Sequence, residues 1–207
     1  MAGNTIANGR RWTPWGETMT SPDAMEFIGA PERIEVTMEP LSGEATVEEV
    51  TLNTYPFTMS KVLKPGRVGR FALEEANISK GTIIDGYERD RGRIKKIRCN
   101  FDYPIIKLTE DGNTWMSDNQ FEVESIRGAV EVARGDVLIG GLGIGLLPTL
   151  IKEKVTSIDI VELHQEVIAL VFHQVATERM KIIHDDIRHY LQSTDKQYDF
   201  IYIDIWR

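Results

Sequence analysis

The sequence has a single cysteine, Cys99, among its 207 residues. One cysteine can form neither an intramolecular disulfide nor a four-cysteine zinc site. The chain contains only four histidines, and their spacing matches no zinc motif, so we expect no bound metal. These histidines are His164, His173, His184 and His189.

Long apolar runs and an excess of positive charge are also missing. No run approaches the ~18 apolar residues that a membrane-spanning helix requires, and the N-terminus lacks the apolar segment of a secretory signal. The chain has 24 lysines and arginines against 32 aspartates and glutamates, a net charge of −8, which disfavours binding to nucleic acid or to an anionic membrane. We therefore expect a cytoplasmic protein with no membrane partner and no nucleic-acid partner.

The N-terminal part of the chain predicts strands. Short apolar/polar alternations occur at 33–38, 44–52 and 92–98, separated by turns rich in glycine and proline. We predict an irregular N-terminal arm at 1–20 and a β-rich N-terminal region at 21–135.

The pattern changes in residues 136–207, where short apolar runs alternate with helical periodicity. Such alternation is typical of βαβ units, so we predict an α/β domain with a truncated, Rossmann-like parallel sheet of about four strands. A bare edge strand would invite pairing with the N-terminal region or with a second copy, which would give a homo-oligomer. The predicted strands are 136–140, 156–161, 181–184 and 198–203, and the predicted helices are 146–154, 166–180 and 187–192.

A glycine-rich loop follows the first of these strands and precedes a helix. Its pattern is G-x-G-x-G, formed by Gly141, Gly143 and Gly145. Glycines at such a turn let the backbone approach a ligand closely, and the helix that follows offers free N–H groups. This loop is a candidate nucleotide-binding turn.

Carboxylates follow the next three predicted strands. Glu162 lies 21 residues after Gly141, where an acid can accept hydrogen bonds from ribose hydroxyls. Asp186 follows the third strand, where a carboxylate can reach an adenine amino group, and Asp204 follows the fourth. Because ligands of open α/β sheets bind at the carboxyl ends of the strands, the pattern predicts a nucleotide site. The alternative is that these acids are ordinary polar loop residues.

The form of the loop bears on which nucleotide it binds. A dinucleotide fingerprint expects a third glycine where this chain has Leu146, which argues against a nicotinamide enzyme. The segments VLIGGLGIG, IVELHQEVI, IIHDDIRHYL and YDFIYIDIW, in this order, resemble the class I S-adenosylmethionine-dependent methyltransferases. Within that superfamily they are most similar to the spermidine synthase-like branch, over about residues 105–207. Because the chain ends at Arg207, we expect the domain to be C-terminally short.

The resemblance implies a role for each matching residue. The three loop glycines would line the methionine part of S-adenosylmethionine, and Glu162 would bind its ribose. Asp186 and the backbone of Ile187 would hold the adenine, and Asp204 would be the catalytic residue that faces the sulfonium and the acceptor. Segment 111–122 would form a hairpin before a substrate-side loop. Two further residues, Asp118 and Trp206, are our candidates for binding the acceptor.

The resulting hypothesis is a transferase that uses S-adenosylmethionine, with methyl transfer favoured and a small-molecule acceptor that the sequence leaves unidentified. Asp204 could orient or deprotonate that acceptor. One alternative is a spermidine synthase-like aminopropyltransferase, which would use the decarboxylated cofactor and an acidic channel. That channel would include Glu122 and Glu124, although the latter and Val123 replace family residues. The other alternative is a non-catalytic, methyltransferase-like binding or assembly protein.

Overall fold

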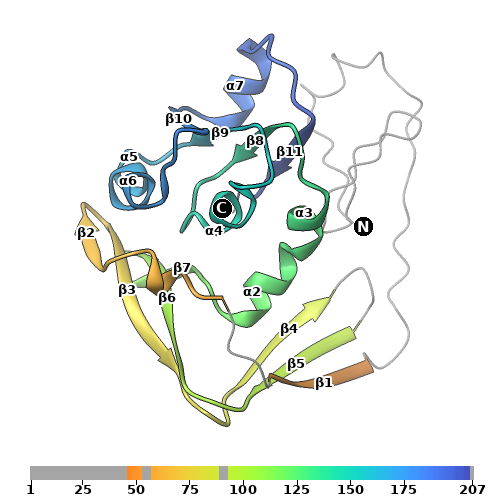
Figure 1. Ribbon diagram of the computed structural model, residues 1–207. Coiled ribbons are helices and arrows are strands. Elements are labelled where there is room, and N and C mark those ends of the chain that lie inside the picture. Colours follow the sequence, from red (N-terminus) through yellow and green to blue (C-terminus); the bar gives the residue numbers. More distant parts are fainter. Residues whose placement is uncertain (1–45, 53–56, 89–92, 206–207) are drawn as a thin grey trace, which may run out of the picture. The chain divides into compact units, whose positions relative to one another are not determined.

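The computed structural model describes residues 46–52, 57–88 and 93–205 (Figure 1). They divide into two compact units. The first contains 46–50, 83–88 and 93–98, and the second contains the remaining described residues. The second unit therefore combines residues from both sides of position 135. The predicted arm, the strand predicted at 33–38 and Trp206 lie outside the described residues.

The first unit is built on a three-stranded sheet of order β1-β5-β4. Strands β4 and β5 pair antiparallel, with Ile83 opposite Arg98 and Glu88 opposite Arg93. The strands predicted at 44–52 and 92–98 are confirmed as β1 and β5. The bounds are β1 Thr46–Leu52, β4 Ile83–Glu88 and β5 Arg93–Cys99.

The second unit begins with a four-stranded antiparallel sheet of order β2-β3-β6-β7. Asp111 and Gly112, with φ of 49° and 82°, make the turn between β6 and β7, which is the conformation that a tight hairpin requires. Segment 111–122, where we expected a hairpin, thus contains the turn and the second strand of one, and its last residues already belong to a helix. The bounds are β2 Gly66–Val68, β3 Phe71–Ile78, β6 Tyr103–Glu110 and β7 Asn113–Ser117, with a short 3₁₀ helix, η1, at Met59–Lys61 before them.

Two helices follow this hairpin, α2 at Gln120–Ser125 and α3 at Arg127–Val132. The region predicted at 21–135 to be β-rich therefore ends in two helices that the strand patterns did not predict. The side chain of Asn119 starts α2 by accepting hydrogen bonds from the backbone N–H groups of Phe121 and Glu122, at 2.9 and 3.2 Å. The capping hydrogen bonds of Asn119 thus start a helix shortly after strand β7 ends.

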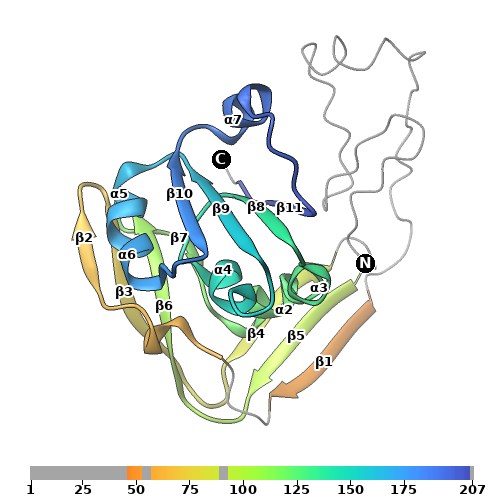
Figure 2. The same cartoon turned by 45° about the horizontal axis from the view of Figure 1, so that its top comes forward.

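A four-stranded parallel sheet of order β10-β9-β8-β11 forms the rest of the unit, so the predicted mixed α/β architecture is confirmed (Figure 2). All four predicted strands are present. They are β8 Asp136–Gly140, β9 Ser157–Glu162, β10 Met180–His184 and β11 Phe200–Ile203.

Helices connect these strands. The helix predicted at 166–180 is shorter than expected, because Ala176 is extended and Met180 already belongs to β10. Its middle turn, η2, is a π-helix. The bounds are α4 Leu146–Ile151, α5 Gln165–Val167, η2 Ile168–Phe172, α6 His173–Val175 and α7 Ile187–Ser193.

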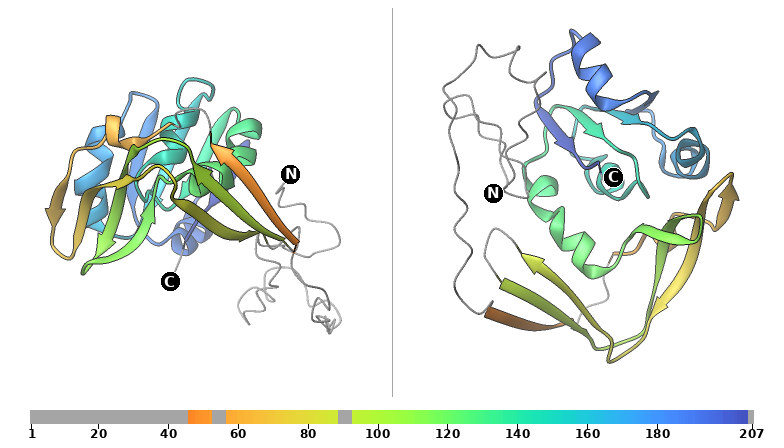
Figure 3. Two further views of the ribbon diagram at one scale, coloured as in Figure 1. Left: turned by 90° about the horizontal axis from the view of Figure 1, so that it is seen from below. Right: turned by 180° about the vertical axis from the view of Figure 1, so that it is seen from behind.

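Apolar side chains cover both faces of the parallel sheet. Val137 and Ile139 of β8 join a core that includes α4, the α5–α6 segment and the antiparallel sheet, whereas Leu138 packs with Ile187 of α7. This alternation follows from the two-residue period of a strand. Figures 1 and 3 accordingly show α7 on one face and α4 to α6 on the other. A sheet covered in this way leaves its carboxyl edge for ligands.

Candidate functional site

The glycine loop lies at the carboxyl end of β8. Gly141, Gly143 and Gly145 have φ of 97°, 52° and 69°, a backbone region that side chains other than glycine rarely adopt. A Cβ on Gly141 would lie 2.5 Å from the backbone oxygen of Asp204, and one on Gly143 would collide with the side chain of Met116. The glycine spacing read from the sequence therefore matches a conformational requirement of the loop.

Backbone hydrogen bonds join this loop to the neighbouring strand ends. The N–H of Gly141 donates to the oxygen of Val161 at 2.8 Å, and the N–H of Asp204 donates to the oxygen of Gly140 at 2.9 Å. The end of β9 and the residue after β11 are thus held beside the loop. The predicted convergence of strand ends at one edge is confirmed.

Glu162 connects the end of β9 directly to the loop. It is 6% exposed, and its Oε2 accepts the backbone N–H of Leu142 at 2.8 Å. Its Oε1 accepts the backbone N–H of His164 at 2.8 Å and lies 3.2 Å from Nδ1 of the same residue. A carboxylate offers about four lone pairs, so three donors leave one for a ligand hydroxyl.

Asp186 and Ile187 form the turn into α7. Asp186 is the N-cap: its Oδ1 accepts the N–H of Arg188 at 2.8 Å, and its Oδ2 lies 2.5 Å from the guanidinium of Arg188. Ile187 is 5% exposed and packs so closely on Gly140 that a Cβ there would lie 2.8 Å from its Cγ1. Its backbone N–H belongs to the first helical turn, where no intrahelical acceptor exists.

Asp204, which follows β11, interacts electrostatically with two other ionisable side chains. Burial, together with the nearby charge of Asp204, raises the pKa of the Glu122 carboxyl on α2. Burial, and then the charges of Asp204 and Glu122, raise the pKa of the Tyr202 hydroxyl. The three residues therefore form a partly buried acidic cluster, in which Glu122 favours its protonated form more than an exposed glutamate would.

Asp118 occupies a different environment from the one we expected for a substrate-binding loop acid. Its side chain is fully buried, and its two oxygens accept the backbone N–H groups of Met59 and of Ile106, the latter at 2.7 Å. Burial raises the pKa of this carboxyl. The structure thus gives Asp118 a structural role that ties η1 to β6. The other candidate, Trp206, is not among the described residues.

An aromatic cluster beside Glu162 was missed by the sequence reasoning. The rings of Phe71, Trp115 and His164 contact one another, with centroids 5.0 to 5.1 Å apart. Trp115 is 43% exposed. A tryptophan in a polar hairpin was the available signal, but nothing local pairs it with Phe71 or His164. The cluster holds the imidazole against the Glu162 carboxylate.

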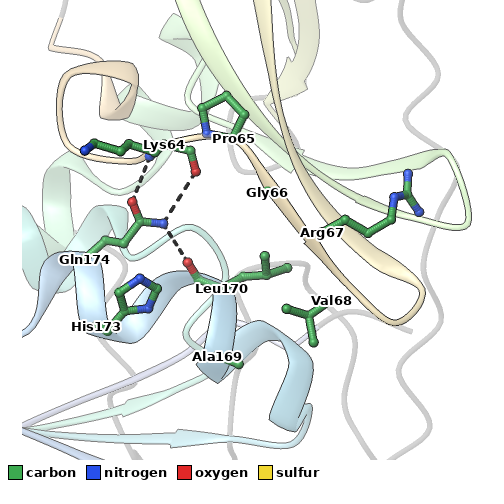
Figure 4. Close-up of a pocket in the computed structure, with 9 residues that line it drawn as sticks. All are labelled: Lys64, Pro65, Gly66, Arg67, Val68, Ala169, Leu170, His173 and Gln174. Carbon is green, nitrogen blue, oxygen red and sulfur yellow. Dashed lines mark hydrogen bonds between the residues drawn. The ribbon is translucent and has the colours of Figure 1, made fainter.

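A pocket of about 310 Å³ lies elsewhere, between β2 and the segment from η2 to α6 (Figure 4). Gln174 crosses it, accepting the N–H of Lys64 at 2.8 Å and donating to the oxygen of Leu170 at 2.7 Å. The side chains of Lys64 and Arg67 point away from each other, so the pocket does not concentrate their charge. None of its lining residues belongs to the glycine loop or to the strand-end acids.

Two further findings concern the part of the chain that the structure describes. No group of three or more histidine, cysteine, aspartate or glutamate side chains there is arranged to hold a metal ion. No helix there is long and apolar enough to cross a membrane.

No protein-family model matches the chain, and no curated protein matches it. The function must therefore be argued from the loop, the strand ends and the acidic cluster.

Proposed function

We propose that the chain binds S-adenosylmethionine at the carboxyl edge of a Rossmann-like sheet and is a transferase, with methyl transfer as the favoured reaction. The observation that carries this proposal is the hydrogen bond between the Glu162 carboxylate and the N–H of Leu142 in the glycine loop. This bond brings an acid able to bind a ribose hydroxyl directly to a loop that admits close approach of a ligand.

The donors and acceptors at this edge fit the adenosine part of the cofactor. Glu162 retains a lone pair for a ribose hydroxyl. The Ile187 N–H can donate to a ring nitrogen, and the Asp186 carboxylate can accept from the amino group, sharing its oxygens with Arg188. The loop backbone can approach the methionine part because its glycines carry no side chains.

The acidic cluster fits the charged end of the cofactor. A sulfonium is a cation, and the carboxylates of Asp204 and Glu122 supply negative charge at a partly buried position. When bound, S-adenosylmethionine supplies a methyl carbon activated for displacement. Asp204 would orient the acceptor and hold the proton that the acceptor gives up.

The same cluster supports aminopropyl transfer as a second candidate, because two neighbouring acids suit a cationic amine acceptor. Offering the folded protein both S-adenosylmethionine and its decarboxylated form separates these reactions. Methyl transfer requires preference for the former, and aminopropyl transfer requires preference for the latter. A non-catalytic binding protein would bind one of them and give no turnover with any acceptor.

Isothermal titration with S-adenosylmethionine and S-adenosylhomocysteine tests the proposal. We expect binding by the full chain, and a Kd raised about tenfold or more by Glu162→Gln, since the amide replaces one acceptor oxygen by a donor. Glu178→Gln, at an exposed position before β10, is the matched control and should bind as the wild type does. Absence of binding of both ligands to the folded wild-type protein would overturn the proposal.

A further inference from the structure

A polar network around one buried carboxylate lies on the opposite side of β9 from α4. Asp159 of β9 is 5% exposed, and its Oδ2 accepts hydrogen bonds from the Lys196 ammonium at 2.8 Å and from the Tyr198 hydroxyl at 2.7 Å. The hydroxyls of Tyr198 and Tyr190 are 2.5 Å apart, and Lys196 also lies 4.9 Å from the centre of the Tyr198 ring. We call these four residues the Asp159 network.

The network fastens α7 and the segment after it to the sheet. Tyr190 belongs to α7, and Lys196 and Tyr198 belong to the connection between α7 and β11. Burying a carboxylate without hydrogen-bond partners costs free energy. The charge of Asp159 therefore favours the conformation in which the connection between α7 and β11 keeps Lys196 and Tyr198 hydrogen-bonded to it. Burial, followed by the hydrogen bonds with Tyr190 and Asp159, raises the pKa of the Tyr198 hydroxyl, so it remains a donor at neutral pH.

Helix α7, which the network holds against the sheet, begins with the turn that we propose binds adenine. Ile187 and Tyr190 are three residues apart on α7 and therefore lie on the same face. Both pack in one apolar cluster with Leu138 and Val161 of the sheet, and Tyr198 belongs to the same cluster. A shift of Tyr190 would consequently move Ile187, and with it the first helical turn and the N-cap Asp186.

We infer that the Asp159 network is a positioning device that sets the adenine selectivity of this site. Asp159, Tyr190, Lys196 and Tyr198 act as positioning residues: they hold α7 so that the Asp186 carboxylate and the Ile187 N–H face the amino group and ring nitrogen of adenine together. This inference rests on the proposed binding of S-adenosylmethionine.

Selectivity between two ligands is the decisive measurement. S-inosylhomocysteine has a carbonyl where S-adenosylhomocysteine has the amino group, and an N–H where the latter has a ring acceptor. Both contacts of the turn are then mismatched, so a rigid turn discriminates strongly between the two ligands. The quantity compared is the Kd of S-inosylhomocysteine divided by the Kd of S-adenosylhomocysteine. This ratio does not depend on the fraction of folded protein, so a network that only stabilises the fold would leave it unchanged.

The variants are Tyr198→Phe, which removes one hydroxyl, and Lys196→Met, at a half-exposed position. We expect each to lower the ratio of Kd values by about fivefold, the worth of one hydrogen bond. Hydrogen exchange of residues 187–193, measured without ligand, should become faster while exchange of α4 stays the same. Lys181→Met, at an exposed position on β10, is the matched control and should change neither quantity.

The outcomes separate this inference from the proposed function. Wild-type protein that binds neither ligand contradicts the proposed function and, with it, an adenine role for the network. Wild-type protein that discriminates, together with folded variants that discriminate equally well, overturns the inference alone. A lower ratio in both variants, with an unchanged ratio in the control, supports it.

Discussion

Oε1 of Glu162 is held by His164 twice, through the backbone N–H at 2.8 Å and from Nδ1 of the ring at 3.2 Å. The imidazole therefore occupies a lone pair that a ribose hydroxyl would otherwise use. Its ring is fixed in this position by Phe71 and Trp115, whose centroids lie 5.0 and 5.1 Å away. His164 is thus a competitor for the acid that we propose binds ribose.

Replacing His164 by phenylalanine tests this competition. The phenyl ring keeps the contacts with Phe71 and Trp115, and the backbone N–H still holds Glu162, but the ring donor is removed. We expect the Kd for S-adenosylhomocysteine to fall about threefold, a change smaller than the worth of one full hydrogen bond because the 3.2 Å contact is long.

His173→Phe, at an exposed position of α6, is the matched control for this titration and should not change the Kd. Weaker binding by His164→Phe, with the melting temperature preserved, would show instead that the imidazole orients Glu162 for the ligand.

The positive φ of Gly143 leads to a stability prediction. Gly143→Ala places a side chain at φ 52° and against the thioether of Met116. The flexible Met116 side chain can move, so backbone strain should dominate, and we expect a loss of about 1–2 kcal/mol in the free energy of unfolding, measured in urea. Gly128→Ala in α3, where no atom lies within 4 Å of the added Cβ, should instead be neutral or stabilising.

A double-mutant cycle with Met116→Ala separates strain from crowding. If strain dominates, Gly143→Ala costs nearly the same with and without the Met116 side chain, with a coupling of at most about 0.5 kcal/mol. A larger coupling would show that crowding by Met116 is the main reason for glycine at this position.

The strands of the parallel sheet could be predicted because their signal is local. Val137, Leu138 and Ile139 are all buried, on alternate faces, and such a continuous apolar run is recognisable without knowledge of the fold. Helix α2 also had a local signal that was overlooked. Asn119 followed three residues later by Glu122 is a typical N-terminal capping pattern.

The surroundings of the site residues could not be predicted in this way. The partners of Asp118 are backbone groups of residues 12 and 59 positions away, so nothing near it in the sequence distinguishes a buried, satisfied carboxylate from a solvated one. Likewise Phe71 reaches His164 only because β3 and the parallel sheet share one apolar core. Strand ends follow from periodicity, whereas side-chain partners follow from tertiary packing.

The structural role assigned to Asp118 can be tested against a ligand-binding role. Asp118→Asn turns one acceptor oxygen into a donor that faces a backbone N–H, and we expect it to lower the free energy of unfolding by about 1–3 kcal/mol. Under conditions where the variant is folded, titration with S-adenosylhomocysteine should give the wild-type Kd. Asp195→Asn, at an exposed position, should change neither property. If the Asp118→Asn variant kept wild-type stability but lost turnover, Asp118 would instead have a role in binding the substrate.

The acidic cluster predicts a pH dependence of stability. Burial and the charge of Asp204 raise the pKa of Glu122 in the folded protein above its value in the unfolded chain. Between these two pKa values the folded state binds more protons than the unfolded state, so stability falls as the pH rises through this interval and stays lower above it. The charged form of Glu122 is therefore destabilising at neutral pH, and protonation removes the cost.

Glu122→Gln mimics the protonated form and should remove this part of the pH dependence. We expect the variant to melt above the wild type at about pH 7 and the two to converge towards about pH 4, where glutamates protonate. Asp204→Asn removes the smaller of the two causes. When it is introduced into both proteins, the gap between them should narrow without closing, since burial of Glu122 remains.

Glu166→Gln on α5 is the matched control for these melting curves. The Glu166 side chain lies against Gly69 and is not part of the acidic cluster, so this variant should not reproduce the effect of Glu122→Gln. Parallel curves for the wild type and Glu122→Gln from acidic to neutral pH would contradict the clustering of Glu122 with Asp204, because a carboxyl that titrates alike in the folded and unfolded chains contributes no pH dependence.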